Sequence, residues 1–272
     1  MILQKIKKKI FELIYLQPKR INIQGKVYNN YNYNYNKKKF RIKIITAYDK
    51  KFKKIGEFCS KSLKNYAKKY NYNFKSYDIP SSEQRPQSWF KIKLIQSILN
   101  NENYDFVLWV DADAFFLRYD TNISSYIEKN KDIYLVAHYV NVHKGSRFQN
   151  TKLTIKRENC GIMLIKNSKF SKDFLKKAWD KEKYVNHPWW ENAAVLDLFG
   201  HRAEINGNLN DHKDNIDITQ RVKLLSYDWN CIPFVNESEI KLDTYNPIII
   251  HMAGMTINER LNFIKNYKKK IN

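Results

Sequence analysis

The sequence is poor in the residues that interrupt or cross-link a chain. Its 272 residues include only 7 Gly, 6 Pro and 3 Cys. The few Gly and Pro are scattered and form no linker in the middle of the chain, which favours one large domain over two small ones. Cys59, Cys160 and Cys231 are odd in number and lack paired spacing, which argues against a disulfide framework and a zinc site. We therefore expect one sizeable core and a reducing compartment.

Long apolar runs are also missing. No stretch reaches the roughly 20 apolar residues that cross a bilayer, and residues 1–17 lack the apolar centre and cleavage site of a secretory signal. Residues 1–17 instead carry Leu and Ile at helical spacing, with Lys5 and Lys7 to Lys9 between them. Such a basic amphipathic helix either lies on an anionic membrane surface or packs on the domain or a partner. The expected location is cytoplasmic, with peripheral membrane contact through this helix as the alternative.

The formal charge of +22 is concentrated at the two ends of the chain. Residues 1–43 hold 12 Lys or Arg against the single acid Glu12, and residues 260–272 add five basic residues and no acid. The long middle of the chain is therefore only moderately basic. Because a nucleic-acid groove needs its charge on the folded core, we expect no nucleic-acid partner. A basic nucleic-acid or membrane-surface protein remains the alternative from a different class.

The order of patterns predicts three segments. Residues 1–39 combine the basic helix with a Tyr/Asn/Lys-rich spacer of low complexity, residues 40–256 form the folded domain, and residues 257–272 form a basic C-terminal helix. Within the domain we predict strands at 40–48, 73–77, 104–110, 133–139, 160–166, 221–226 and 247–251, and helices at 51–70, 87–100, 121–130, 168–179 and 189–199. The strand–helix alternation predicts an α/β fold with a mostly parallel central sheet flanked by helices.

Two carboxylates at the end of an apolar run are the most informative feature. Residues 106–110 (Phe-Val-Leu-Trp-Val) lead directly into Asp111 and Asp113, and a second apolar run follows. An unbroken run of this kind is typical of a strand buried on both faces, and ligands bind beyond the carboxyl ends of such strands. A paired Asp there suits a hard divalent cation that holds a diphosphate. The spacing alone is weak, because a helix N-cap or a solvated turn also explains it.

His251 follows a second apolar strand, in Ile-Ile-Ile-His-Met-Ala-Gly over residues 248–254. A single His after a strand is usually structural. Two strands that end in metal-competent side chains are less easily accidental, and imidazole suits Mn²⁺. We therefore predict that Asp111, Asp113 and His251 bind Mn²⁺, with Mg²⁺ as the alternative.

Other strand ends and one helix supply candidates for the donor pocket. Thr46, Ala47 and Tyr48 end the first strand, and Gly254 follows the predicted metal-binding His. Lys91 lies on the helix before the acidic pair and either reaches a phosphate or donor hydroxyl or is a solvated helix lysine. Asn159 and Gly161 open a strand, where Gly permits close backbone approach to a ligand and Asn can bond a sugar hydroxyl. A turn with a capping Asn is the alternative for that pair.

The segment Pro-Trp-Trp-Glu-Asn over residues 188–192 suits a carbohydrate site. Indole rings pack on the C–H faces of sugars, while carboxylate and amide groups fix hydroxyls. We predict that Trp189 and Trp190 bind an acceptor, although one of them could equally belong to the core. Glu191 and Asn192 could simply favour the dipole of a helix that begins there.

Together these motifs resemble glycosyltransferase family 34, which contains fungal α-1,2-galactosyltransferases, related mannosyltransferases and plant xyloglucan xylosyltransferases. The resemblance covers about residues 40–256 and is carried by five blocks in order: Trp89-x-Lys91, Trp109-x-Asp111-Ala112-Asp113-Ala114, Asn159-x-Gly161-Ile162, Trp190-Glu191-Asn192-x-Ala194 and His251-x-Ala253-Gly254.

The resemblance implies a GT-A fold, a nucleotide-sugar donor, Mn²⁺ and transfer with retention of anomeric configuration. By position it makes Asp111, Asp113 and His251 metal ligands and makes Lys91 and Asn159 donor contacts.

It also places Glu191 and Asn192 beside the reacting carbon. The chain departs from the family in having Asn192 where relatives carry Gln. It also has Thr256 where some relatives carry a Lys near the diphosphate. Arg260 is the candidate to replace that Lys.

The function expected from the sequence is therefore a retaining, metal-dependent glycosyltransferase. It would move a hexose or pentose from a nucleotide-sugar, most simply a UDP-sugar, to a hydroxyl of a glycan or glycolipid acceptor. Another GT-A transferase with a different donor, such as the glycogenin-like group, is the alternative within the class.

Overall fold

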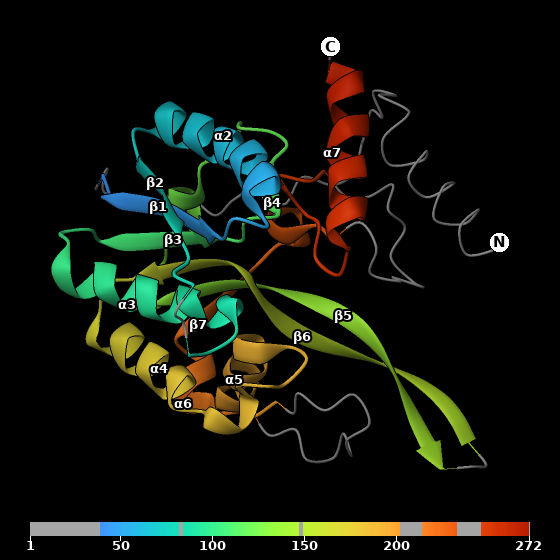
Figure 1. Ribbon diagram of the computed structural model, residues 1–272. Coiled ribbons are helices and arrows are strands. Elements are labelled where there is room, and N and C mark those ends of the chain that lie inside the picture. Colours follow the sequence, from blue (N-terminus) through green and yellow to red (C-terminus); the bar gives the residue numbers. More distant parts are fainter. Residues whose placement is uncertain (1–38, 82–83, 147–148, 202–213, 233–245, 272) are drawn as a thin grey trace, which may run out of the picture.

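The computed structural model describes residues 39–81, 84–146, 149–201, 214–232 and 246–271, and for residues 139–156 and 268–271 it describes the backbone alone. Among these residues six strands form one sheet in the order β2-β1-β3-β6-β5-β7 (Figure 1). The strands are β1 (Ile42–Tyr48), β2 (Asn73–Asp78), β3 (Phe106–Val110), β5 (Ile133–Ser146), β6 (Gln149–Lys166) and β7 (Val222–Leu225). The expected helix over residues 1–17 and the low-complexity spacer lie outside the described residues.

The sheet is mostly parallel. β1 pairs in parallel with β2 and β3, and β5 pairs in parallel with β7. Only β6 runs in the opposite direction, antiparallel to both β3 and β5. The α/β class and the flanked, mostly parallel sheet predicted from the sequence are thereby confirmed.

The core lies on both faces of this sheet because its central strands carry unbroken apolar runs, residues 106–110 in β3 and 162–165 in β6. On one face Ile45, Val107 and Met163 pack beneath the helices α3 (Phe90–Asn101), α4 (Lys169–Trp179) and α5 (Trp190–Leu198). On the other face Ile44, Leu108 and Leu164 pack against α2 (Lys53–Tyr70) and Trp229. Successive residues of β1, β3 and β6 thus alternate between two buried layers, as expected for strands covered on both sides.

A second, two-stranded sheet places the C-terminal part of the chain beside the acidic pair. β4 (Ala114–Phe116) follows Asp113 directly and pairs antiparallel with β8 (Ile249–His251). In this ladder Ala114 lies opposite His251, and the backbone N–H of Met252 donates to the carbonyl oxygen of Asp113 at 3.0 Å. The second apolar run, which the sequence shows after the acidic pair, is a separate strand because the chain turns at that pair and leaves the main sheet.

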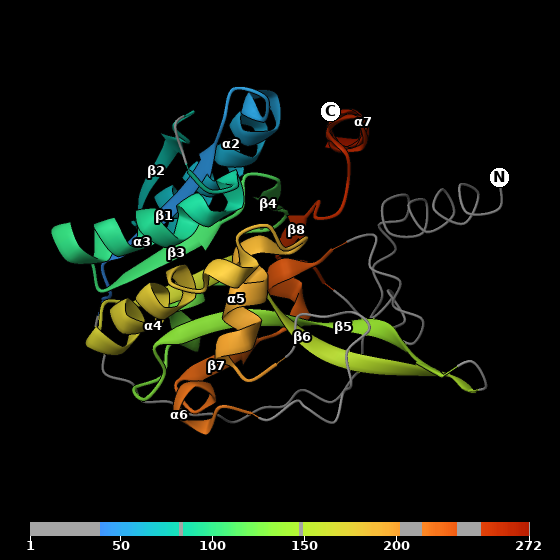
Figure 2. The ribbon, with the colours of Figure 1, turned by 60° about the horizontal axis from the view of Figure 1, so that its bottom comes forward.

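Two elements extend away from the sheet. The β5–β6 hairpin projects beyond the body of the domain, and α7 (Ile257–Ile271) stands beside α2 and β4 (Figures 1 and 2). Phe263 and Ile264 of α7 are buried with Ile55 and Phe115. The closing helix is therefore packed on the domain through an apolar face. No helix among the described residues has the length and apolar character needed to cross a membrane.

The predicted elements agree with the structure except at a few points. The helix expected near 121–130 is wrong: the chain forms only a short 3-10 turn, η2 (Ile123–Tyr126), capped by the Asn122 side chain. The strands expected at 133–139 and 160–166 are parts of the longer strands β5 and β6. The helix expected at 168–179 is present as α4, and the Ser168 hydroxyl caps its start by accepting from the Ser171 N–H at 3.2 Å.

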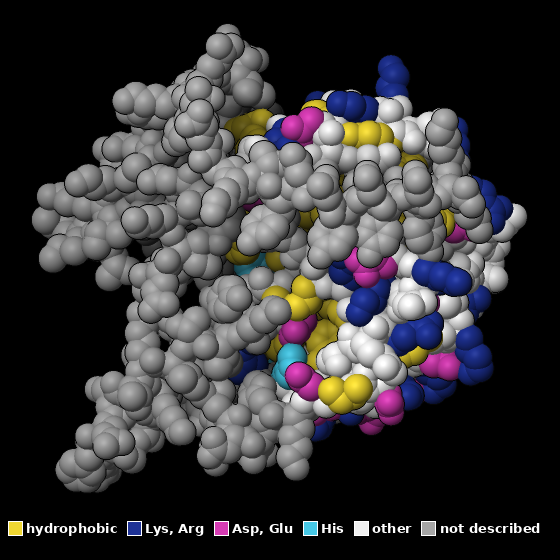
Figure 3. Space-filling view, turned by 180° about the vertical axis from the view of Figure 1, so that it is seen from behind, with side chains coloured by type: hydrophobic (Ala, Val, Ile, Leu, Met, Phe, Trp, Pro, Cys, Tyr) yellow, Lys and Arg dark blue, Asp and Glu magenta, His cyan; other side chains and the backbone are white. Residues whose placement is uncertain are grey.

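The described surface carries no continuous basic groove on the face shown in Figure 3. Lys and Arg side chains are spread around that face and alternate with acidic and neutral side chains (Figure 3). This distribution agrees with the sequence, in which the excess positive charge lies at the ends of the chain.

The Tyr66 hydroxyl gives a test of the packing between α2 and the segment after β4. Tyr66 is fully buried, stacks on Phe116 with ring centroids 3.8 Å apart, donates to the Thr121 carbonyl and accepts from the Ile123 N–H. We expect Tyr66→Phe to lower the free energy of unfolding by about 1–3 kcal/mol, because the buried Ile123 N–H and the half-buried Thr121 carbonyl lose their partner. Urea unfolding measures this change.

Tyr70→Phe is the matched control. The Tyr70 hydroxyl donates only to the Tyr119 carbonyl, at a half-buried position. Its loss should cost less than the loss at Tyr66; equal costs would contradict the role assigned to the buried hydroxyl.

Candidate active site

The described residues enclose a cavity of about 1000 Å³ at the carboxyl edge of β1 and β3. Its walls come from the ends of these strands, the start of α3, the segment of β6 that enters the sheet, the start of α5 and the residues from β8 to α7. All but one of the site residues expected from the sequence line it. They are Ala47, Tyr48, Lys91, Asp111, Asp113, Asn159, Gly161, Trp189, Trp190, Glu191, Asn192, His251 and Gly254.

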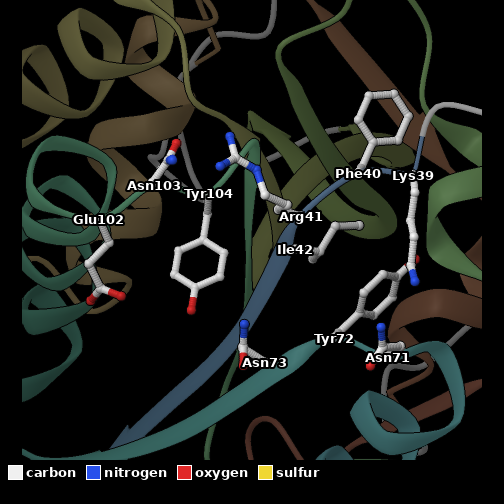
Figure 4. Close-up of a pocket in the computed structure, with 10 residues that line it drawn as sticks. All are labelled: Lys39, Phe40, Arg41, Ile42, Asn71, Tyr72, Asn73, Glu102, Asn103 and Tyr104. Atoms are coloured by element: carbon white, nitrogen blue, oxygen red, sulfur yellow. The ribbon is translucent and has the colours of Figure 1, made fainter.

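A smaller cavity of about 560 Å³ lies at the opposite, amino-terminal ends of β1, β2 and β3 (Figure 4). Arg41, Tyr72 and Glu102 are among its lining residues. Arg41 is paired with Asp105 and Glu102 with Lys43. None of the site residues expected from the sequence lines it.

Asp111, Asp113 and His251 converge on one point of the larger cavity. Their ligand atoms lie within 4.8 Å of one another. His251 Nε2 is 3.3 Å from Asp113 Oδ1 and 3.7 Å from Asp111 Oδ2. The end of β3 supplies both carboxylates, and the β4–β8 ladder brings the imidazole from far downstream.

The outer oxygen of each carboxylate is held by other groups. Asp111 Oδ1 accepts from Trp109 Nε1 at 2.6 Å and pairs with Lys91 Nζ at 2.8 Å. Asp113 Oδ2 pairs with both Nε and a terminal nitrogen of Arg260, at 2.9 and 2.8 Å. Burial raises the pKa of Asp113, but His251 and Arg260 outweigh that effect and hold its pKa below the usual range. The oxygens that face His251 are thus the ones available to a ligand.

A chain of amides fixes the imidazole ring. Asn230 Oδ1 lies 2.8 Å from His251 Nδ1, and Asn230 Nδ2 donates to Asn159 Oδ1 at 2.9 Å. Asn159 Oδ1 also accepts from the N–H of Gly161. Because Nδ1 is engaged, Nε2 is the nitrogen that faces the carboxylates. Sequence reasoning missed Asn230, since its role depends on tertiary reach and no local motif marks it.

Gly161 is required for a reason other than the one expected. A Cβ at this position would lie 2.2 Å from His251 Cε1 and 2.6 Å from His251 Nδ1. The close approach that glycine permits is therefore between the β6 backbone and the imidazole. Asn159 is likewise bonded within the protein through its oxygen, which leaves its Nδ2 as the atom that could meet a sugar hydroxyl.

Lys91 and Glu191 form a buried ion pair next to Asp111. The ammonium lies 2.8 Å from Glu191 Oε1, and both side chains are about 95% buried. Burial alone would lower the pKa of Lys91. The carboxylates of Asp111 and Glu191 outweigh this effect and hold the pKa above its usual value, so the ammonium stays charged. Burial, assisted by Asp111 and opposed by Lys91, raises the pKa of Glu191. Lys91 is thus no solvated helix lysine.

Asn192 and the two tryptophans occupy the start of α5. Asn192 Oδ1 accepts from the Cys160 N–H at 2.8 Å, and its Nδ2 donates to the Glu158 carbonyl at 3.2 Å. Its amide therefore holds the β6 backbone. Trp189 lies under the Arg157 guanidinium at 4.9 Å from the ring centroid. Trp190 is 44% exposed and has a φ of 45°, a left-handed conformation that is costly for a bulky residue.

The remaining donor candidates lie on two segments. Ala47 and Tyr48 line the cavity at the end of β1, whereas Thr46 is fully buried one residue earlier and does not line it. Gly254 has a φ of 77°, and a Cβ added to it would have no atom within 4 Å.

The donor set fits a hard divalent cation. The imidazole nitrogen lies 3.3 and 3.7 Å from the two carboxylate oxygens, and the ligand atoms of the three residues lie within 4.8 Å of one another. Adjacent ligands of an octahedral ion with bonds of about 2.1 Å lie about 3 Å apart, so a small closure suffices. The group could therefore bind a metal.

Comparison with known proteins identifies the family. The model of the nucleotide-diphospho-sugar transferase family matches residues 43–260. The chain belongs to this family. No protein of curated function matches the sequence significantly. The family match covers both carboxylates, His251 and Arg260.

Solved structures of glycosyltransferases share the fold at low sequence identity. One is involved in glycosylation of the major capsid of PBCV-1, with 15% identity, a TM-score of 0.55 and coverage of 83% of this chain and 99% of that one. The galactosyltransferase LgtC, bound to donor and acceptor sugar analogues, has 12% identity, a TM-score of 0.50 and coverage of 84% and 94%. The bifunctional WbbM has 11% identity, a TM-score of 0.51 and coverage of 85% and 50%. The predicted GT-A fold is confirmed.

The contact between Gly161 and His251 gives a test of the candidate metal site. We expect Gly161→Ala to displace the imidazole and weaken Mn²⁺ binding about 10- to 100-fold, as changes beside metal ligands do. The rise in melting temperature on adding Mn²⁺ measures the affinity.

Gly254→Ala is the control, because its added Cβ meets nothing within 4 Å. It should lose about 1–2 kcal/mol of stability from its left-handed backbone and keep the response to Mn²⁺. An unchanged Mn²⁺ response in Gly161→Ala would contradict the assignment of His251 as a ligand.

Proposed function

We propose that this transferase is metal-dependent and moves a hexose or pentose from a nucleotide-sugar to a hydroxyl of a glycan or glycolipid, with retention of anomeric configuration. A UDP-sugar is the expected donor and Mn²⁺ the expected metal. The observation that carries the proposal is the convergence of Asp111, Asp113 and His251 in a cavity at the carboxyl edge of the sheet. In an open α/β sheet this edge is where ligands bind.

The residues divide the work of donor binding among themselves. Asp111, Asp113 and His251 would hold a divalent cation, which would supply a Lewis acid for the diphosphate. Ala47 and Tyr48, at the end of β1, form the wall for the nucleoside, and Gly254 lets the backbone approach the phosphates. Arg260 brings a guanidinium to the same edge. It takes the place of the lysine that some relatives carry at the position of Thr256.

The Lys91–Glu191 pair governs the reacting centre. Lys91 is locked between Asp111 and Glu191, so it presents a fixed positive charge beside the donor without needing to reorganise. Lys91 and the Ser88 hydroxyl interact with the Glu191 carboxylate, and its Oε2 is buried at the cavity wall. This oxygen is placed to meet a donor hydroxyl or the developing positive charge of the sugar.

Retention has two routes. In the front-face route the departing phosphate accepts the proton of the acceptor hydroxyl, and no covalent intermediate forms. A double displacement needs a carboxylate on the opposite face of the sugar ring, and Glu191 is the candidate. Its engagement with Lys91 favours an electrostatic role and hence the front-face route.

Trp189 and Trp190 form the acceptor wall in this proposal. Trp190 keeps its indole exposed at the cavity despite an unfavourable backbone conformation, which supports a functional rather than a core role. Membership of glycosyltransferase family 34 in particular remains a prediction, and the glycogenin-like group remains the alternative within the GT-A class.

Donor turnover tests the proposal directly. The purified chain is incubated with UDP-galactose, UDP-glucose, UDP-xylose or GDP-mannose, with Mn²⁺ or with EDTA, and release of nucleotide is measured. We expect one UDP-sugar to be hydrolysed with Mn²⁺ and not with EDTA, and Asp113→Asn to abolish the reaction. Turnover that survives both EDTA and Asp113→Asn would contradict a metal-dependent site.

Glu191→Gln separates the two routes to retention. The change keeps shape and removes charge, so we expect a loss in kcat of roughly 10²-fold or less from altered positioning. A nucleophile would instead cost about 10⁶-fold. The measurement is kcat for transfer, together with the anomeric configuration of the product by NMR. A loss near the larger value would contradict the front-face route.

A further inference from the structure

His138 is a buried imidazole whose hydrogen-bonding groups the proposed function does not use. It lies on β5, is 4% exposed and lines the larger cavity. Neither of its ring nitrogens has a hydrogen-bond partner among the described residues. The ring packs edge-on against Tyr227, with centroids 5.1 Å apart.

An imidazole in this position costs free energy until a polar group meets it, because unpaired buried polar atoms are destabilising. Burial and the nearby His251 lower the pKa of His138 to about 3, so the ring is neutral at physiological pH. A neutral imidazole offers one N–H donor and one acceptor nitrogen. A hydroxyl can serve either nitrogen, whereas a phosphate or carboxylate would find no positive charge on the ring.

The strand register places His138 along the cavity from the metal site. In the β5–β6 ladder Val136 lies opposite Asn159, and His138 lies opposite Arg157. Residues two apart on a strand share a face and are about 7 Å apart. His138 therefore lies beside Arg157, two residues further along β6 from Gly161 and His251 than Asn159.

The same step leads to the aromatic wall. The Arg157 guanidinium, opposite His138, lies over the Trp189 ring. A ligand that runs from the metal site along β6 passes Asn159 and then reaches His138, Arg157 and Trp189.

We propose that His138 binds a hydroxyl of the acceptor saccharide and, with Trp189, forms a subsite that selects the acceptor. This inference rests on the proposed function and deepens it. The subsite lies on the β5–β6 side of the cavity, whereas the end of β1 and Lys91 lie on the donor side. Its ligand class is a neutral, hydroxyl-rich sugar ring.

The test compares the full chain with His138→Phe and His138→Gln. Phe keeps a ring against Tyr227 and removes both nitrogens, while Gln restores one donor and one acceptor. The probes are the methyl α- and β-glycosides of galactose, glucose and mannose, titrated against tryptophan fluorescence. The KM of the donor, the KM of any glycoside that accepts sugar, and the melting temperature are measured in parallel.

We expect at least one glycoside to bind the unmodified chain. His138→Phe should raise its Kd about tenfold, as loss of one or two hydrogen bonds does, with partial recovery in His138→Gln. The melting temperature of His138→Phe should not fall, because an unpaired buried polar group has been removed, and the KM of the donor should not change.

Three results would overturn the inference: no binding of any glycoside, an unchanged Kd in His138→Phe, or a fall in its melting temperature that His138→Gln restores, which would mark a structural histidine. Each is separate from failure of the proposed function. Fluorescence binding requires no turnover, and donor hydrolysis requires no acceptor.

Discussion

Balance of buried charge is the constraint on which this site depends. Asp113 and Glu191 are 7% and 4% exposed, and Asp111 lies between them at the same edge of the sheet. Buried carboxylates this close destabilise a fold unless cations are fixed beside them. Lys91 from α3 bridges Asp111 and Glu191, and Arg260 from α7 pairs with Asp113. Two helices that are far apart in the sequence, α3 and α7, are therefore tied to one edge of the sheet by ion pairs.

This arrangement also explains which atoms remain for ligands. Each Asp uses its outer oxygen for Trp109, Lys91 or Arg260 and directs its inner oxygen toward His251. The cations thus neutralise the carboxylates without occupying the point where three ligand atoms meet. In the proposed function a cation and a diphosphate would bring charges of opposite sign, so the site could accept both without moving its own ion pairs, which is the condition for electrostatic preorganisation.

Sequence patterns predicted the fold and the centre of the site but not the groups that hold it. The apolar run before Asp111 predicted a doubly buried strand because burial on both faces leaves a local signature, and the same signature precedes His251. Asn230 and the β4–β8 pairing could not be predicted, since they depend on contacts between distant segments. The helix expected at 121–130 failed because the chain becomes extended at Ile127 and the Glu128 N–H donates to the Tyr134 hydroxyl instead of a helical carbonyl. The sequence predicted that the backbone at Gly161 approaches another group closely. Only the structure shows that this group is the His251 imidazole.

The reversed direction of β6 gives the cavity its continuity. A parallel strand would present only its last residues at the ligand edge, whereas β6 crosses that edge on its way into the sheet. Its residues therefore line the cavity in sequence, with Arg157 over Trp189, Asn159 at the amide chain and Gly161 against His251. Asn192 fastens this segment to α5 through two backbone hydrogen bonds. One strand thus sets the distance between the Asp111, Asp113 and His251 group and Trp189, and a shift along it would displace both sides of the cavity at once.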